Sequence, residues 1–387
     1  MGSGTREPPG ELGHDSREFG RDRMLGALAS GLFSVAIGII SVAVPLLALR
    51  TGYGTAQVGL LVALSAVSQL IARSFMGALM RKLPDKFFVI SAAVFISVSS
   101  GLIAVSTTVL AFVIAQALQG VARAFFFTGN QTHAVRVSTS AVRGLTTVNL
   151  AGGLGALLGP AVAGLLSEHS AQLALAVGVG TGGLTLVPAA FLLRLAPFAG
   201  AHRQPGRIWR RPGVGTACWG GMTSGTWKGL LDSYVPVALA LAAQSASTIG
   251  ILISIANAAA LLGSGLAGWV RRLGIRRSLL IGIVATGIGS AAFGALADQP
   301  VAAAAALIVS GLGAGLLQTI GPATATEAVH PEERGDAIAS VGLFRASALF
   351  VAPLGMAGMV LSAPVSVAFV VAGALVSLPL LLARPQT

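Results

Sequence analysis

The sequence alternates between long apolar runs and short polar segments. Runs such as 24–49 and 278–297 contain no charged residue over 20 or more consecutive positions. A helix of about 20 apolar residues crosses the roughly 30 Å hydrocarbon core of a bilayer. The runs lack the two-residue alternation of membrane barrel strands and exceed their length, and a spanning segment must satisfy its own backbone hydrogen bonds. The pattern therefore predicts transmembrane helices.

Several runs are long enough for two passes, and they divide at polar or turn-forming positions such as Thr107, Gln244 and Pro364. This division predicts an all-α integral membrane protein with twelve transmembrane helices. The expected spans are 24–49, 56–80, 87–107, 109–129, 145–166, 171–194, 214–241, 246–270, 278–297, 300–324, 336–361 and 364–383. Because the number of spans is even, both chain ends lie on the same side of the membrane.

Six landmarks recur in phase about 191 residues apart, so the chain consists of two copies of one six-helix unit. They pair Pro45 with Pro236, Gly59 with Gly250, Gly77 with Gly268, Arg81 with Arg272, Gly120 with Gly311, and Arg143-Gly144 with Arg334-Gly335. The expected organisation is a tail (1–23), an N-terminal half (24–195), a linker (196–213) and a C-terminal half (214–387). Tandem halves with a binding site at their seam are a design of secondary transporters.

Composition and charge agree with a membrane protein, since 54% of the residues are hydrophobic and 10% charged. A net charge of +12 would suggest nucleic acid for a soluble protein, but here the loop cations gather on one side, as the positive-inside rule requires. That side holds Arg81, Lys82, Lys86, Arg136, Arg143, Arg203, Arg207, Arg210, Arg211, Arg271, Arg272, Arg276 and Arg277, and the opposite loops hold Arg50. We therefore expect a multi-pass protein of the bacterial cytoplasmic membrane, with both termini cytoplasmic, the lipid bilayer as its partner and no nucleic acid. The tail has no apolar core, so it is neither a cleaved signal peptide nor a span.

The loops after the second and eighth spans carry a motif-like run of basic residues. The second copy reads Ala267, Gly268, Trp269, Val270, Arg271, Arg272, Leu273, Gly274, Ile275, Arg276, Arg277, and the degenerate first copy keeps Arg81 and has Asp85-Lys86 at the basic pair. This run resembles the glycine, aspartate and arginine loop motif of the major facilitator superfamily, and the resemblance covers 24–383. In that family the motif locks helix ends in one access state, which implies a gating role for Arg81, Lys86, Arg272, Gly274, Arg276 and Arg277. The alternative is that all of them are positive-inside anchors, an interpretation we prefer for Lys82 and Arg271.

The fifth span contains Gly155, Gly159 and Pro160, and its counterpart in the eleventh span keeps Pro353. The spacing resembles the glycine-proline motif of superfamily antiporters and implies a bending helix in an exporter. Small-residue packing between helices is the alternative.

Charged residues inside spans are costly in lipid unless they face a cavity or a partner, so they are the candidate substrate and coupling residues. Lys228 and Asp232 are one helical turn apart and can form a pair or jointly face a cavity. A mutually neutralised structural pair, with Asp232 wet at the outer surface, is the alternative. Arg345 lies too deep to reach the surface easily, whereas Arg123 could face either the interior or the surface, and Arg73 fits an interfacial anchor.

Uncharged polar residues such as Gln119 and Asn149 could line the path. The family's fourth-helix arginine, tied to proton movement, is replaced by Gln116 in this chain. Proton coupling would then have to use Asp232, the only acid in or near the middle of a span, or use another group, or be absent.

Other chemistry is sparse in this sequence. The single cysteine, Cys218, lies within a span, the histidines lack ligand spacing, and the glycine-rich patches lack the lysine and serine of a phosphate loop. The sequence therefore predicts no metal site, no cofactor and no enzymatic activity. His133 and His330 are expected in solvated loops.

The predicted function is secondary active transport of a small organic molecule, exported by proton-coupled antiport through alternating access. A neutral, glycine- and serine-rich cavity would favour a moderately hydrophobic cargo. One alternative is uptake or facilitated transport of a small polar or anionic metabolite, with Arg345, Arg123 and Lys228 as its contacts. Another is a transport-inactive receptor or scaffold. Two halves already enclose a path, so we expect a monomer.

Overall fold

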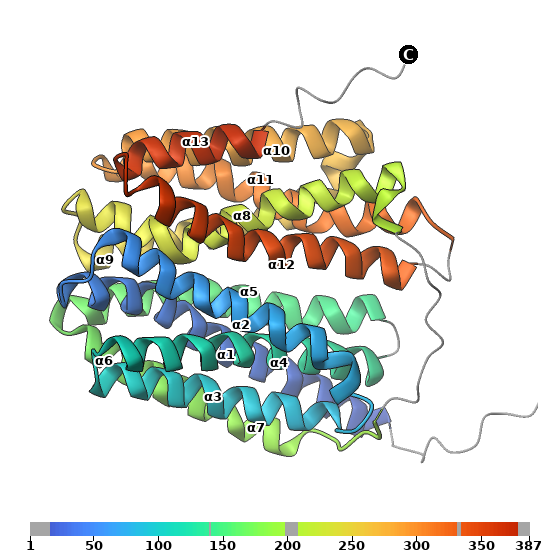
Figure 1. Cartoon of the computed structure of the whole chain (residues 1–387). Helices are drawn as coiled ribbons and strands as arrows, with labels where there is room; N and C mark the ends of the chain where they lie inside the picture. Colours follow the sequence, from blue (N-terminus) through green and yellow to red (C-terminus); the bar gives the residue numbers. More distant parts are fainter. Residues whose placement is uncertain (1–15, 139–140, 198–207, 331–333, 378–387) are drawn as a thin grey trace, which may run out of the picture.

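The computed structural model describes residues 16–138, 141–197, 208–330 and 334–377, and these residues form a bundle of helices (Figure 1). The N-terminal half contains α1 (Ser16–Arg50), α2 (Thr55–Leu79), α3 (Asp85–Val105), α4 (Val109–Arg136), α5 (Ala141–His169), α6 (Ala171–Leu184) and α7 (Leu186–Phe191). The C-terminal half contains η1 (Ile208–Arg210), α8 (Pro212–Leu241), α9 (Ala246–Val270), η2 (Arg271–Leu273), α10 (Ile275–Leu296), α11 (Pro300–Glu327), α12 (Arg334–Met359) and α13 (Val365–Ser377).

The predicted fold class is confirmed, because these elements form the twelve membrane helices of the two halves. Within the described residues, ten helical segments are long and apolar enough to cross a membrane, and α8 and the shorter α13 complete the set. The sixth span is formed by α6 and α7, which meet at Thr185. The break lies three residues before Pro188, which has no N–H to donate within the helix.

Several boundaries differ from the predicted ones. α1 begins at Ser16 rather than 24, and α4 continues to Arg136 rather than ending at 129. Both extensions carry charged side chains that the apolar pattern excludes from a span. The predicted tail up to residue 15, the loop cations Arg203 and Arg207, and positions 378–387 lie outside the described residues.

We call the side where α1 and α8 begin the terminal side, and the opposite side, where α1 ends and α2 begins, the distal side. The two halves lie one above the other in Figure 1, with the N-terminal half in blue to green below the C-terminal half in yellow-green to red. On the distal side the Tyr234 hydroxyl donates to the Thr55 carbonyl at 3.2 Å, and Glu168 accepts from the Ser247 amide at 2.8 Å. Contacts on this side therefore join one half to the other.

Small residues bring α5 close to its neighbours. A methyl group at Gly159 would come within 2.5 Å of the Val35 carbonyl oxygen on α1, and one at Gly164 would come within 2.5 Å of the Ala246 carbonyl oxygen on α9. α5 is continuous through Pro160, as α12 is through Pro353. The glycines of the fifth span thus serve close packing. A bending role for Gly155, Gly159, Pro160 and Pro353 stays a prediction.

Candidate functional site

The middle of the bundle holds an ion pair on α8. Lys228 Nζ lies 2.8 Å from Asp232 Oδ1, the i,i+4 pairing that the sequence predicts. Lys228 also donates to Asn257 Oδ1 on α9 at 3.3 Å. Asp232 is 6% exposed, so its carboxylate is buried rather than wet at the distal surface.

Arg123 on α4 completes this group from the other half of the protein. Its Nη1 lies 3.8 Å from Asp232 Oδ2, and its side chain is 14% exposed. Asp232 therefore receives one cation from its own helix and one from the opposite half. Arg123 faces the seam between the halves instead of the membrane surface, which resolves the two orientations open at the sequence level.

Two further arginines extend the group toward the terminal side. Arg345 on α12 donates from Nη2 to Gln318 Oε1 at 3.2 Å, and the charges of Arg73 and Asp232 both act on it. Arg73 belongs to α2, which packs against α12. Arg73 is half-buried, and its role as an interfacial anchor stays a prediction. We call Arg73, Arg123, Lys228, Asp232 and Arg345 the central cluster.

The central cluster contains four cations and one acid, a net charge of +3. The Nε atoms of Arg73, Arg123 and Arg345 are buried and donate to no group in the described part of the chain. Buried donors without an acceptor are costly. The cluster thus offers unused positive charge and unused donors at the seam of the two halves.

The two residues predicted to line the path, Gln119 and Asn149, differ in burial and in hydrogen bonding. Gln119 is buried on α4, one turn from Arg123, and its Nε2 donates to no described group. Gln116 is also buried, and its Oε1 accepts from no described group. Asn149 is exposed, and its Oδ1 accepts from Gln131 Nε2 at 3.4 Å. Asn149 therefore belongs to an α4–α5 contact in the described structure rather than to the central cluster.

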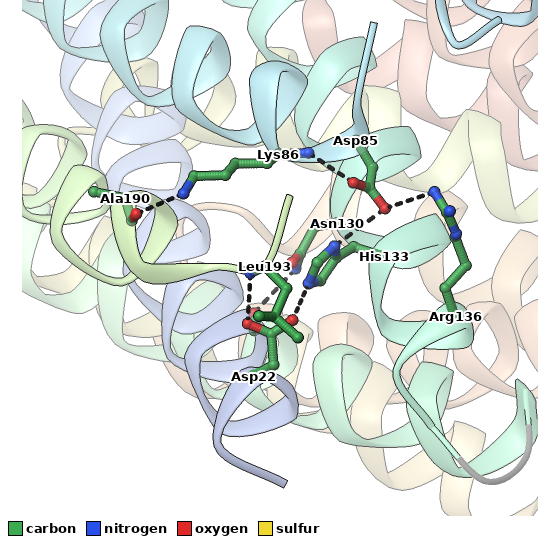
Figure 2. A network of polar contacts seen from close by, with 9 residues as sticks. Asp22, Asp85, Lys86, Asn130, His133, Arg136, Ala190 and Leu193 are labelled. Carbon is green, nitrogen blue, oxygen red and sulfur yellow. Dashed lines mark hydrogen bonds and ion pairs between the residues drawn. The ribbon is translucent and has the colours of Figure 1, made fainter. Parts of the chain in front are cut away.

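A second polar centre, the terminal-side network, ties α1, α3 and α4 together within the N-terminal half (Figure 2). His133 Nε2 lies 2.5 Å from Asp22 Oδ2, and His133 Nδ1 lies 3.1 Å from Asp85 Oδ2. Arg136 Nη1 lies 3.4 Å from the same Asp85 oxygen, and the Leu193 amide donates to Asp22 Oδ1 at 2.9 Å. The segment after α7 is thereby attached to the end of the bundle.

His133 is fully buried, so the expectation of a solvated histidine is wrong. Both of its ring nitrogens face carboxylate oxygens, which accept but do not donate unless they are protonated. The arrangement therefore fits a charged imidazolium between the two acids. Sequence reasoning missed this network, although an acid at each of positions 22 and 85, on a side rich in cations, was an available signal.

The family-motif residues lie on the terminal side. Gly274 has φ of +95°, a conformation that favours glycine, and it reverses the chain between η2 and α10. Arg271 forms an ion pair with Glu327 at the end of α11, and because both side chains are at least 40% exposed, an anchoring role stays a prediction. Lys86 Nζ donates to the Ala190 carbonyl at 2.7 Å. The remaining members of the predicted gating set, all exposed, are Arg81, Arg272, Arg276 and Arg277.

A two-half bundle of twelve membrane helices with charged side chains at its seam is an architecture that transporters use. The sequence matches the family model of the Major Facilitator Superfamily over residues 26–228 and again over 217–386. The chain belongs to this superfamily, and it is a multi-pass membrane transporter and not an enzyme. None of the curated protein sequences matches the chain.

Solved structures of transporters share the fold at low sequence identity. The nucleoside transporter NupG is 12% identical with a TM-score of 0.74, over 96% of this chain and 100% of that one. A bacterial homologue of the human lysosomal transporter Spinster, inward-facing and unoccupied, is 13% identical with a TM-score of 0.74, over 89% and 83%. A POT family transporter in complex with a thioalcohol-conjugated peptide is 13% identical with a TM-score of 0.71, over 97% of each chain.

Proposed function

We propose that this transporter carries a small organic anion together with a proton, with the central cluster as its binding site. The observation that supports this proposal is the net charge of +3 on the buried Asp232 and the half-buried Arg73, Arg123, Lys228 and Arg345. Uncompensated charge inside a membrane protein is costly, and an anion entering the cluster would offset it. A neutral lipophilic cargo would leave that cost in place. The anionic alternative is therefore favoured over the hydrophobic cargo expected from sequence.

Asp232 is the proposed proton carrier. As a carboxylate it holds Lys228 and Arg123, at 2.8 Å and 3.8 Å, and competes with an incoming anion for both cations. Protonation releases both cations for the anion. Because linkage is reciprocal, a bound anion also favours protonation of Asp232. Proton and anion then move in the same direction, which makes uptake driven by the proton gradient the proposed mode in place of antiport.

The proposed orientation follows from the positive-inside rule, with the terminal side and both termini in the cytoplasm of a bacterial cell. The distal contacts of Tyr234 with Thr55 and of Glu168 with Ser247 then join the two halves on the outer side. Alternating access requires these contacts to separate while the two halves rotate about the cluster. The two halves supply all cluster residues, so a monomer is the proposed working unit.

Uptake by purified protein in proteoliposomes tests this function. We expect an acidic exterior to accelerate uptake of radiolabelled carboxylates from a mixed panel, and an uncoupler to abolish the acceleration. Lys228→Gln should lower the rate at least tenfold, whereas Arg194→Gln, the same charge change at an exposed position outside the helices, should not. Flux of a lipophilic dye without carboxylate flux would instead support the exporter of hydrophobic molecules. No flux of any solute would favour a transport-inactive receptor.

A further inference from the structure

The central cluster has two cationic regions at different depths. Lys228 is 16 residues from the terminal-side start of α8, and Arg345 is 11 residues from that of α12. The Arg345 carbonyl oxygen packs against Gly225, three residues before Lys228, so at 1.5 Å per residue Lys228 lies about 4 to 5 Å deeper than Arg345. Arg73 lies six residues before the terminal-side end of α2, on the shallower side with Arg345.

The two regions differ in how their cations are used. Lys228 and Arg123 share the carboxylate of Asp232, at 2.8 Å and 3.8 Å. Arg345 donates to the neutral Gln318, and it feels an unfavourable charge from Arg73 and a favourable one from Asp232. Both Arg73 Nε and Arg345 Nε are buried without an acceptor among described groups. Two guanidinium groups on packed helices, each with a buried and unpaired Nε donor, suit the binding of an anionic group.

We propose that Arg73 and Arg345 form a second anion subsite, and that the substrate is a short-chain dicarboxylate. One carboxylate binds between Arg73 and Arg345, and the other binds at Lys228 and Arg123 when Asp232 is protonated. Guanidinium groups match the planar geometry of carboxylates and bind them through parallel hydrogen bonds. This inference rests on the proposed function, because it specifies the anion that the central cluster carries. Gln318 is a positioning residue that orients Arg345.

Two carboxylates also offset two of the positive charges of the cluster. A dicarboxylate brings two negative charges, so the net charge of +3 falls to +1 with Asp232 ionised and to +2 with Asp232 protonated. A monocarboxylate leaves one more positive charge in either state. The subsite lies between the two halves, since Arg73 belongs to α2 and Arg345 to α12. A dicarboxylate would therefore contact both halves at two depths and stabilise their closure around it.

Isothermal titration calorimetry of the purified full chain in detergent tests the second subsite. The probes are succinate and glutarate against butyrate and valerate, which have matching chain lengths and one carboxylate fewer. For the unmodified protein at neutral pH we expect the dicarboxylates to bind about tenfold or more tightly than their monocarboxylate partners, the usual effect of an added charge-assisted hydrogen bond. Arg73→Gln should abolish that preference by weakening dicarboxylate binding about tenfold more than monocarboxylate binding. Arg194→Gln, the matched control, should change neither affinity.

The outcomes separate the two proposals. Equal affinity for mono- and dicarboxylates, or equal weakening of both by Arg73→Gln, would overturn the second subsite and leave the organic-anion transporter in place. Absence of binding by every carboxylate would overturn both. Arg345→Gln is a second variant that should also abolish the dicarboxylate preference if Arg73→Gln does not fold. Size-exclusion profiles and unfolding temperatures of each variant show whether a lost preference reflects the subsite or the fold.

Discussion

Asp232→Asn is the substitution that most directly tests the coupling of proton and anion. The amide has nearly the shape of the carboxylate but never carries its charge, so the variant resembles the protonated state of Asp232. Lys228 and Arg123 are then available to an anion at every pH. We expect the variant to bind anions more tightly than the unmodified protein at high pH and equally well at low pH.

The size of this effect follows from the contacts that the anion must displace. The Asp232 carboxylate lies 2.8 Å from Lys228 Nζ and 3.8 Å from Arg123 Nη1. Opposite charges about 4 Å apart attract by about 4 kcal/mol at an effective dielectric constant near 20. The Lys228 side chain is 24% exposed, so solvent screens part of this attraction. We therefore expect the Asp232 carboxylate to weaken anion binding by about 2 kcal/mol, which is the range for charge-assisted hydrogen bonds. This free energy corresponds to about a thirtyfold change in Kd.

The assay is the pH dependence of the Kd of a carboxylate, measured by calorimetry on both proteins. The unmodified protein should lose affinity as pH rises, and Asp232→Asn should not. Asp298→Asn is the matched control, because it makes the same change at an exposed residue of the distal loop between α10 and α11. In transport, Asp232→Asn should still exchange anion for anion but should no longer respond to a proton gradient. The reasoning is refuted if the affinity of Asp232→Asn keeps the pH dependence of the unmodified protein.

Three further predictions concern stability and conformation. His133→Asn removes the cation between two buried carboxylates, so we expect a loss of about 3 kcal/mol or more in unfolding free energy, seen as a lower Tm. The control His169→Asn, at an exposed position, should leave the Tm unchanged. Equal Tm values for the two variants would show that His133 is not charged. Gly164→Val would place side-chain atoms against the backbone of α9, since even a methyl group comes within 2.5 Å of a carbonyl oxygen there. We expect transport to fall at least tenfold while carboxylate binding is retained. Unchanged transport would show that α5 and α9 need not approach this closely. Glu327→Gln removes the partner of Arg271, but both side chains are at least 40% exposed. The Tm should therefore change by less than the equivalent of about 1 kcal/mol. A larger drop would show that this ion pair stabilises the fold.

The helices could be predicted from sequence because membrane spans depend on the length of an apolar run. That criterion fails at the ends of α1 and α4, where the helices continue through charged residues. Asp22 and His133 are 111 positions apart, and each can be buried only because the other lies beside it. A pattern within one span cannot reveal such a partner. His133 was therefore assigned to a solvated loop, whereas the structure buries it between two acids.

The central cluster was predictable to the extent that its contacts are local. The pairing of Lys228 with Asp232 follows from their spacing on one helix, and the depth of Arg345 follows from counting residues. The orientation of Arg123 and Arg73 depends on how the two halves pack, which helical spacing does not determine. Asn149 was assigned to the path on polarity alone, and its helix turns it toward Gln131 instead.

The two halves share a scaffold, but they do not share the charges of the site. At the repeat distance of about 191 residues, the counterparts of Arg123 and Arg345 are Ala314 and Leu154, and those of Lys228, Asp232 and Arg73 are Ile37, Ser41 and Ser264. The N-terminal half contributes two cations to the cluster, and the C-terminal half contributes two cations and the acid. A substrate or proton bound there therefore meets different chemistry on its two sides and must engage both halves at once. Binding energy at such a seam acts directly on the relative position of the halves, which alternating access requires. The repeated helical scaffold thus supports the motion of the two halves, and the charged residues that are not repeated determine which substrate is carried.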